Sequence, residues 1–263
     1  MDLHTYIQAL LAQEEYSFSL EEIREQINNS DIAIKRQLDR LVEKKKVFNL
    51  RKGFYLILPP LYAKMGKLPL SLYADKMFSS LDKIYYVGLF SAARLHGAGH
   101  QQVQQDYIIT PTPKLRDIQK GPYQIRFFTA QYWPTSHIIR TTSESRAYCI
   151  SSPALTFADL IHHQSKIGGL SRSIATLEEL SEAITDTDLE SLVLWYPYRS
   201  TLQRMGLILD TIIGVPSLAE IVYKELIKGP FFPTTLSPLA ERKPRYVQNR
   251  WKININIQLE NDL

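Results

Sequence analysis

The sequence lacks most of the features that mark secreted, membrane and disulfide-rich proteins. Its 263 residues include one cysteine, Cys149, so the chain cannot form an internal disulfide and a reducing, cytoplasmic location is expected. Residues Met1 to Gln13 carry no basic region of the kind that opens a signal peptide. No apolar run reaches the roughly 18 residues of a membrane helix, which predicts that no segment spans a membrane.

Motifs for metal binding and catalysis are also missing. His162 and His163 are adjacent on a predicted helix, so they point to different sides and are interpreted as a surface pair. His96 and His100 flank glycines, and we interpret that segment as a turn held by hydrogen bonds rather than a catalytic pair. Asp159 and the acids between Glu178 and Glu190 are expected to form a helix surface. The phosphate-binding, dinucleotide-binding and nucleophile-elbow motifs are absent, so no catalytic residue, metal or cofactor is predicted.

What the sequence does have is an ordinary globular composition with an uneven distribution of charge. The hydrophobic fraction is 44% and the charged fraction 22%, which excludes a disordered chain. The net charge of +4 indicates no particular partner. However, residues 35–52 contain eight Lys and Arg against two acids, and residues 242–252 contain five against none. Two basic zones are therefore set on a chain that is otherwise acidic.

The first part of the chain predicts three helices followed by a hairpin. Apolar residues recur at helical spacing from Leu3, and Ser19 with Glu22 forms a capping-box signature for a second helix. A third helix is expected from about Asp31 to Lys45. Two short strands, 47–50 and 54–58, then flank a turn that ends in glycine. This order is typical of a winged helix-turn-helix, which we predict for residues 1–60.

Residues 61–263 predict a larger, mixed α/β C-terminal domain, so the fold class of the whole chain is α+β. Its segment 103–150 is strand-rich, and its segment 151–228 is helical, beginning at the Ser152 cap and Pro153. Further helices are expected at 71–81 and 87–95. The alternation from Trp251 to Leu259 predicts one terminal strand.

The third helix and the hairpin turn carry the predicted DNA-binding residues. Arginine can bind guanine with two hydrogen bonds, glutamine can do the same for adenine, and lysine mainly attracts phosphate. The alternative interpretation is a solvated helix face on a protein-binding winged helix. We favour DNA binding because the basic residues coincide with the helix that enters the major groove. The predicted contacts are Lys35, Arg36, Gln37, Arg40 and Lys44 on the helix, and Arg51 and Lys52 in the wing.

A second basic patch near the end of the chain allows two interpretations. Tyr246 and Trp251 are interleaved with its basic residues. Aromatic and basic side chains together can bind nucleic acid, by stacking on bases and by attracting the phosphate backbone. The same pattern also fits an edge strand whose charges discourage aggregation. The patch consists of Arg242, Lys243, Arg245, Arg250 and Lys252.

Three segments carry a resemblance to a known family. They are Arg51–Pro59 at the end of the predicted winged helix, Tyr85–Gln102 with its sequence YYVGLFSAARLHGAGHQQ, and the helix start Ser151–Leu160. Together they resemble the AbiEi antitoxins of bacterial type IV abortive-infection systems, which act in phage defence. The segment Tyr85–Gln102 is the most specific of the three.

The resemblance implies an antitoxin that also represses its own operon by binding inverted repeats in the promoter. It implies a nucleotidyltransferase-like toxin as the functional partner, counteracted by routes that need not involve a stable complex. The C-terminal domain is the part that the resemblance associates with antitoxicity. Two alternatives stay open from the sequence: a ligand-responsive winged-helix transcription factor unrelated to a toxin, and an enzyme such as a nuclease that the winged helix directs to DNA.

Overall fold

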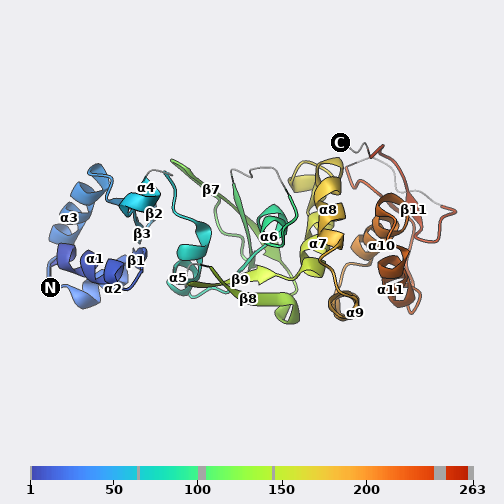
Figure 1. Cartoon of the computed structure of the whole chain (residues 1–263), viewed down its shortest axis with the longest axis horizontal. Helices are drawn as coiled ribbons and strands as arrows, with labels where there is room; N and C mark the ends of the chain where they lie inside the picture. Colours follow the sequence, from blue (N-terminus) through green and yellow to red (C-terminus); the bar gives the residue numbers. More distant parts are fainter. Residues whose placement is uncertain (1, 64–65, 100–104, 144–145, 240–246, 260–263) are drawn as a thin grey trace. The chain divides into compact units, whose positions relative to one another are not determined.

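The computed structural model describes residues 2–63, 66–99, 105–143, 146–239 and 247–259, and the chain divides into two compact units (Figure 1). The first unit comprises residues 1–86, 104–131 and 140–149. The second comprises residues 87–103, 132–139 and 150–263. The predicted mixed α/β character is confirmed.

The first unit begins with three helices around an apolar cluster. They are α1 (Leu3–Ala12), α2 (Leu20–Gln26) and α3 (Asp31–Glu43), with the short strand β1 (Ser17–Ser19) before α2. The predicted capping box is confirmed: the Ser19 hydroxyl accepts from the Glu22 N–H at 3.1 Å, and the Glu22 carboxylate accepts from the Ser19 N–H at 2.7 Å. The helices share a core that includes Leu3, Ile7, Phe18, Ile23, Ile34 and Leu38.

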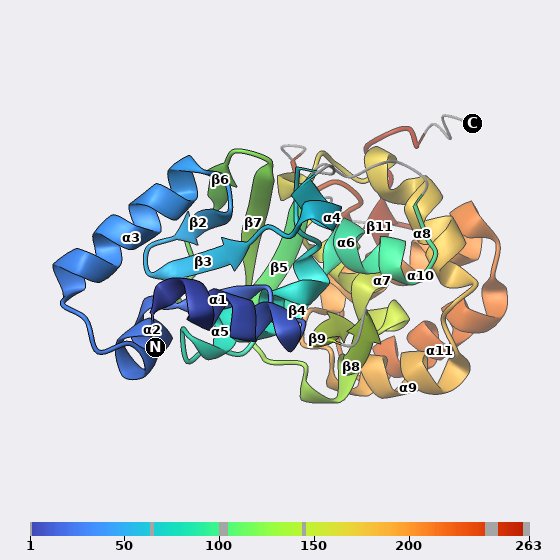
Figure 2. The same ribbon diagram turned by 60° about the vertical axis from the view of Figure 1, so that its left-hand side comes forward.

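The predicted hairpin is also confirmed and belongs to a three-stranded antiparallel sheet. β2 (Val47–Arg51) pairs with β3 (Phe54–Ile57), and Gly53 takes the positive φ of +76° that the turn between them requires. β3 also pairs with β1, so the strand order is β1-β3-β2. Figure 2 shows β2 and β3 next to each other. β1 escaped prediction because three residues are too few to show an alternating pattern.

A six-stranded mixed sheet follows, in the order β6-β7-β5-β4-β9-β8. β5 and β7 run parallel, and β6 pairs antiparallel with β7. The four strands predicted between 103 and 150 are confirmed as β5, β7, β8 and β9, whereas the short β4 and β6 were missed. The strands are β4 (Tyr86–Val87), β5 (Asp106–Pro111), β6 (Ile118–Lys120), β7 (Tyr123–Ala130), β8 (Ile138–Ser143) and β9 (Arg146–Ser151).

Short helical pieces connect these sheets, and two predicted helices are shorter than expected. The predicted helix 71–81 is a 3₁₀ turn, η1 (Leu70–Leu72), followed by α5 (Ala74–Ser79). The predicted helix 87–95 begins only after β4, because Val87 pairs with Ile150 in the sheet. The remaining connectors are α4 (Pro60–Ala63) and the 3₁₀ turn η2 (Thr135–His137).

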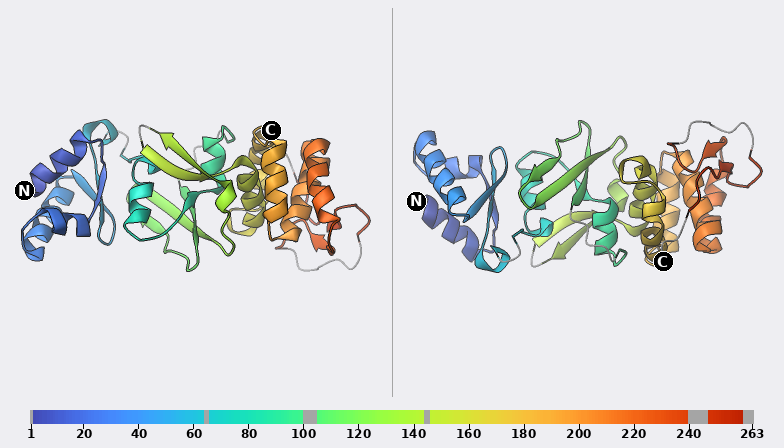
Figure 3. Two further views of the ribbon diagram at one scale, coloured as in Figure 1. Left: turned by 90° about the horizontal axis from the view of Figure 1, so that it is seen from below. Right: turned by 90° about the horizontal axis from the view of Figure 1, so that it is seen from above.

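The second unit is mainly helical, as predicted for 151–228, and its helices pack side by side (Figure 3). α7 is its central helix, since every residue from Ala154 to Ile161 is buried. The Ser152 hydroxyl caps it by accepting from the Leu155 N–H at 3.3 Å. The helices are α6 (Leu89–Leu95), α7 (Pro153–His162), α8 (Ile174–Ser181), α9 (Asp186–Trp195), α10 (Arg199–Leu207) and α11 (Pro216–Leu226), with 3₁₀ turns η3 (Gln164–Lys166) and η4 (Ser171–Ser173) and a π-helical segment η5 (Ile208–Ile213).

The strand predicted for Trp251–Leu259 is wrong over most of its length. Only β11 (Ile253–Asn254) forms, and it pairs in parallel with the equally short β10 (Thr234–Thr235). The alternating pattern has another cause at its start, because Trp251 is buried against Gly206 of α10. Ile255 is 61% exposed, so the alternation does not mark a buried face there. None of the helices in the described residues has the length and apolarity needed to span a bilayer.

Candidate nucleic-acid interface

The orientation of α3 is set by its buried side and by its first turn. Ile34 and Leu38 anchor it in the apolar cluster, and the Ser30 hydroxyl caps it by accepting from the Ala33 N–H at 3.3 Å. The Arg24 guanidinium of α2 binds both carboxylate oxygens of Asp31, at 3.0 and 2.8 Å. An exposed ion pair adds little stability, but the two parallel hydrogen bonds fix the geometry between α2 and α3.

The predicted DNA-reading side of α3 is an exposed row of cations. Arg36, Arg40 and Lys44 are four residues apart, so they lie along one face of the helix. Figure 2 shows α3 on the outside of the first unit. Within the part of the chain that the structure describes, these three side chains form no hydrogen bond or ion pair, which leaves their charges available to a ligand. Lys35 is exposed on the neighbouring face, and Gln37 is half-buried.

The hairpin of β2 and β3, which we call the wing hairpin, offers less exposed charge than the sequence indicates. Lys52 at its turn is exposed, whereas Arg51 is half-buried and burial lowers the pKa of its guanidinium. Asn49 accepts a hydrogen bond from the Lys120 ammonium group at 2.8 Å. Lys52 is therefore the predicted wing cation with the greater access to solvent.

The second basic patch divides into a part that forms internal contacts and a part outside the described residues. Arg250 forms ion pairs with Asp210 at 2.9 Å and with Glu220 at 3.0 Å, and its guanidinium lies 4.8 Å from the centre of the Trp251 ring. Lys252 donates to the backbone carbonyl of Phe231 at 3.1 Å, and its ammonium group lies over the Phe231 ring. These two cations hold the end segment against the rest of the second unit. The residues outside the described part are Arg242, Lys243 and Arg245.

The prediction that His162 and His163 form a surface pair is wrong. His163 is 6% exposed and His162 is half-buried, because α7 is enclosed by other helices on nearly every side. Burial, together with a smaller contribution from the neighbouring Lys166, lowers the pKa of His162 to about 4 and that of His163 to about 3. Both rings are therefore neutral at neutral pH. No group of three potential metal ligands occurs among the residues described.

This buried pair predicts an acid-sensitive stability. Unfolding returns both histidines to a pKa near 6.5, so between about pH 6.5 and pH 4 the unfolded state binds protons that the folded state does not. The free energy of unfolding therefore decreases as the pH falls through this range, by at most about 1.4 kcal/mol per pH unit for each histidine. Urea unfolding between pH 7 and pH 5 measures the loss. The His162→Gln variant should show a shallower dependence, and an identical slope would contradict the assignment.

The segment that begins at His96 is a turn fixed by hydrogen bonds, as predicted. His96 Nε2 lies 2.7 Å from the Ser151 carbonyl oxygen, and burial lowers the pKa of the ring. Gly97 and Gly99 take φ values of +86° and +114°, which side chains with a Cβ rarely adopt. His100 lies outside the described residues.

The prediction that Asp159 and the acids from Glu178 to Glu190 form only a helix surface is wrong for three of them. Asp159 is buried in α7. Glu179 accepts the Gly99 N–H at 2.5 Å. Asp188 accepts the Ala154 N–H at the start of α7 at 2.9 Å and lies 3.3 Å from Nδ1 of the buried His137. Burial alone would raise the pKa of Asp188, but the hydrogen bonds from His137 and Ala154 lower it below its usual value. Partners so distant in sequence leave no local pattern that could reveal them.

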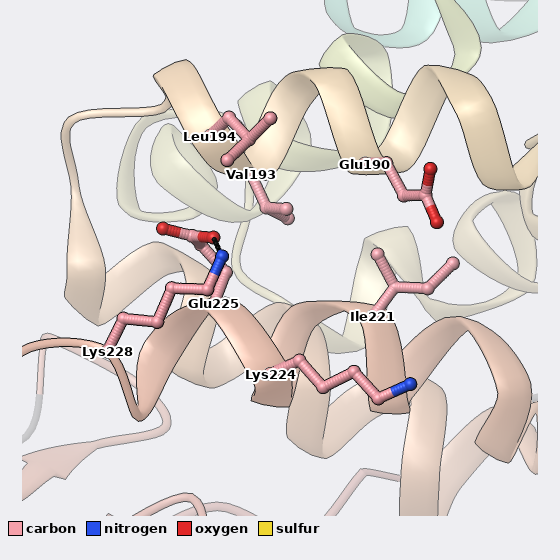
Figure 4. A pocket seen from close by; sticks show the side chains of 7 residues that line it. All are labelled: Glu190, Val193, Leu194, Ile221, Lys224, Glu225 and Lys228. Carbon is pink, nitrogen blue, oxygen red and sulfur yellow. Dashed lines mark hydrogen bonds and ion pairs between the residues drawn. The ribbon is translucent and has the colours of Figure 1, made fainter.

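Two hollows differ in the character of their linings. A groove of about 270 Å³ between α9 and α11 has Val193, Leu194 and Ile221 on its walls and charged residues at its rim, where Lys228 pairs with Glu225 at 2.6 Å (Figure 4). The lining thus combines three aliphatic side chains with two carboxylates and two lysines.

The other hollow, of about 500 Å³ in the first unit, is polar. Its arginines are engaged by acids: Arg146 with Glu15 at 2.6 Å, and Arg140 with Asp75 at 3.0 Å. The first of these pairs joins the loop after α1 to β9, and thereby holds the N-terminal helices to the rest of the first unit.

These elements define a class of protein: a three-helix module with an exposed cationic helix and a short antiparallel sheet, followed by a mixed sheet and a helical unit. Residues 86–211 match the family model of the AbiEi antitoxin C-terminal domain. The resemblance to the AbiEi antitoxins noted in the sequence is thus confirmed by this domain. No curated protein matches the chain.

A solved structure extends the likeness in fold beyond the matched domain. The crystal structure of the RV2827C protein from Mycobacterium tuberculosis superposes with a TM-score of 0.65 at 15% sequence identity. The match covers 94% of this chain and 89% of that chain. At this level of identity the comparison establishes a shared fold, including the N-terminal elements that precede residue 86.

Proposed function

We propose that this protein is a non-enzymatic antitoxin that also represses its own operon. Residues 1–60 act as a winged helix-turn-helix that binds inverted repeats in the promoter, with Arg36, Gln37 and Arg40 reading bases and Lys35, Lys44, Arg51 and Lys52 binding phosphates. Residues 61–263 counteract a nucleotidyltransferase-like toxin in the cytoplasm. Because each repeat takes one recognition helix, two copies of the chain bind each operator.

The exposed cationic row of α3 is the observation that carries the DNA-binding part. A helix that is anchored by Ile34 and Leu38 and presents two unpaired arginines on its open side has the shape and chemistry for the major groove. The order of helices and strands around it matches that of a winged helix-turn-helix. The same three-dimensional arrangement supports a role for Lys52, which is exposed at the turn of the wing hairpin.

The antitoxin part of the proposal is supported by the match of residues 86–211 to the AbiEi antitoxin C-terminal domain, and co-expression tests it. The full-length protein is expressed together with the nucleotidyltransferase-like product of the adjacent gene, and growth is measured. Relief of growth arrest is the expected result, and unrelieved arrest would contradict the proposal.

The full-length Arg36→Ala/Arg40→Ala variant separates the two activities in the same assay. Both side chains are exposed, so the variant should lose repression of a promoter–reporter fusion yet still relieve growth arrest. Loss of both activities at equal protein level would indicate that antitoxicity depends on DNA binding. If the purified protein instead binds its operator only in the presence of a small molecule, the chain is a ligand-responsive regulator.

A further inference from the structure

The edge strand of the wing hairpin lies beside the edge strand of the six-stranded sheet (Figure 2). Phe48 of β2 packs against Tyr123 of β7, with ring centres 4.8 Å apart. Gly121, between β6 and β7, lies so close to the Phe48 ring that a Cβ at position 121 would be 3.3 Å from it. Lys120 donates to Asn49 at 2.8 Å. The loop from 112 to 122, which includes β6, is thus fixed next to the wing hairpin.

This loop, which we call the basic loop (residues 112–122), carries an excess of positive charge. Its three cations, Lys114, Arg116 and Lys120, are exposed, and Asp117 is its one acid. Asp117 is already engaged, since it pairs with Lys114 at 3.2 Å and accepts the Phe127 N–H at 2.9 Å. Arg116 has no hydrogen bond or ion pair to any residue that the structure describes. Lys120 uses one N–H on Asn49, and an ammonium group has three.

The wing hairpin needs additional charge if it is to bind phosphate strongly. Lys52 is its exposed cation, whereas Arg51 is half-buried. Lys120 lies beside Asn49 of β2, which is two residues before Arg51 in the same strand. Its ammonium group therefore adds an exposed positive charge next to the wing hairpin. The two elements are far apart in the sequence, since Lys120 and Asn49 are separated by 71 residues, and the contacts of Phe48 hold them together.

We propose that the basic loop is a second phosphate-contacting element, which binds the DNA backbone beside the wing hairpin through Arg116 and Lys120. The inference rests on the proposed DNA-binding function and adds a contact made by residues outside 1–60. Contacts to phosphate carry no direct sequence information, so the binding that this loop adds is independent of base sequence. Its signature is therefore a change in salt dependence rather than in specificity.

The full-length Arg116→Gln/Lys120→Gln variant tests the proposal. Glutamine keeps a donor for Asn49, so the contact with β2 can persist while the charge is removed. Binding to the operator duplex and to a scrambled duplex is measured by fluorescence anisotropy from about 50 to 200 mM salt. We expect the slope of log K against log salt to fall by about 1.8 for two lost phosphate contacts, with affinity for both duplexes reduced to a similar degree.

The Lys166→Gln/Lys228→Gln variant is the matched control, because it removes the same number of exposed cations from the second unit. The control variant should keep the salt slope of the unmodified protein. The Arg116→Lys/Lys120→Arg variant retains both positive charges and should keep that slope as well. An unchanged slope in Arg116→Gln/Lys120→Gln overturns this inference but leaves the proposed function intact, provided that Arg36→Ala/Arg40→Ala still abolishes binding. Failure of the unmodified protein to bind either duplex overturns both.

Discussion

Replacement of Arg36 and Arg40 by alanine is expected to abolish specific binding to the operator. The two guanidinium groups project from one exposed face of α3, and each bidentate contact to a guanine is worth about 1–3 kcal/mol. Loss of both should weaken operator binding by about a hundredfold or more. Binding to scrambled DNA should weaken much less, because phosphate contacts from Lys44 and Lys52 remain. Titration of labelled operator and scrambled duplexes measures the ratio.

The variant should fold normally, since neither side chain contributes to the core beneath α3. An unchanged melting temperature verifies this. The Lys166→Ala/Lys228→Ala variant removes two exposed cations elsewhere and should bind the operator as the unmodified protein does. If the Arg36→Ala/Arg40→Ala protein is folded and retains its operator affinity, α3 is not the recognition helix and the alternative of a solvated, protein-binding face is favoured.

Substitution of Gly206 by alanine is expected to destabilise the second unit, although alanine is the better helix former. In an open helix this change would stabilise by about 1 kcal/mol. Gly206 lies in α10 directly beneath Trp251, and a Cβ at this position would lie 1.9 Å from the indole ring. The ring cannot remain in place, so we expect a net loss of about 2–4 kcal/mol from overpacking and from exposure of the indole. Urea unfolding measures it.

A double-mutant cycle isolates the contact with the ring. In a Trp251→Leu background the space beneath residue 206 is larger, so the cost of Gly206→Ala should fall by at least half. Intrinsic fluorescence gives a second measurement, because displacement of the buried Trp251 should shift its emission to longer wavelength. If Gly206→Ala lowers the free energy of unfolding equally in both backgrounds, contact with the indole ring is not the cause of the destabilisation.

The contacts around Trp251 also explain why the end of the chain does not form the single strand that its alternating pattern predicts. Trp251 Nε1 donates to Asp210 at 2.9 Å, and Arg250 pairs with the same carboxylate. Gln203 of α10 donates to the Trp251 carbonyl at 2.8 Å. The end segment is thus held mainly by side chains of helices. Its backbone pairs with another strand over two residues, where β11 meets β10.

Local structure was largely predictable where it depends on neighbours in the sequence. The Ser19–Glu22 capping box, the Ser152 cap and the glycine turn of the wing hairpin follow from residues three or four apart. The strands β5 and β7 were recognisable because their buried residues form continuous or alternating apolar runs. The short strands β1, β4 and β6 were not, since two or three residues show no period.

The sequence by itself determined the cationic row of α3 and the resemblance to the AbiEi antitoxins, because both depend on the types and spacing of residues within short segments. The tertiary structure decided which charges are available. It buried His163 within the helices around α7, engaged Arg250 and Lys252 in internal contacts, and placed Lys120 beside the wing hairpin. Such outcomes depend on packing between elements tens of residues apart, and a hydrogen bond or a desolvated ring leaves no signal in the local pattern.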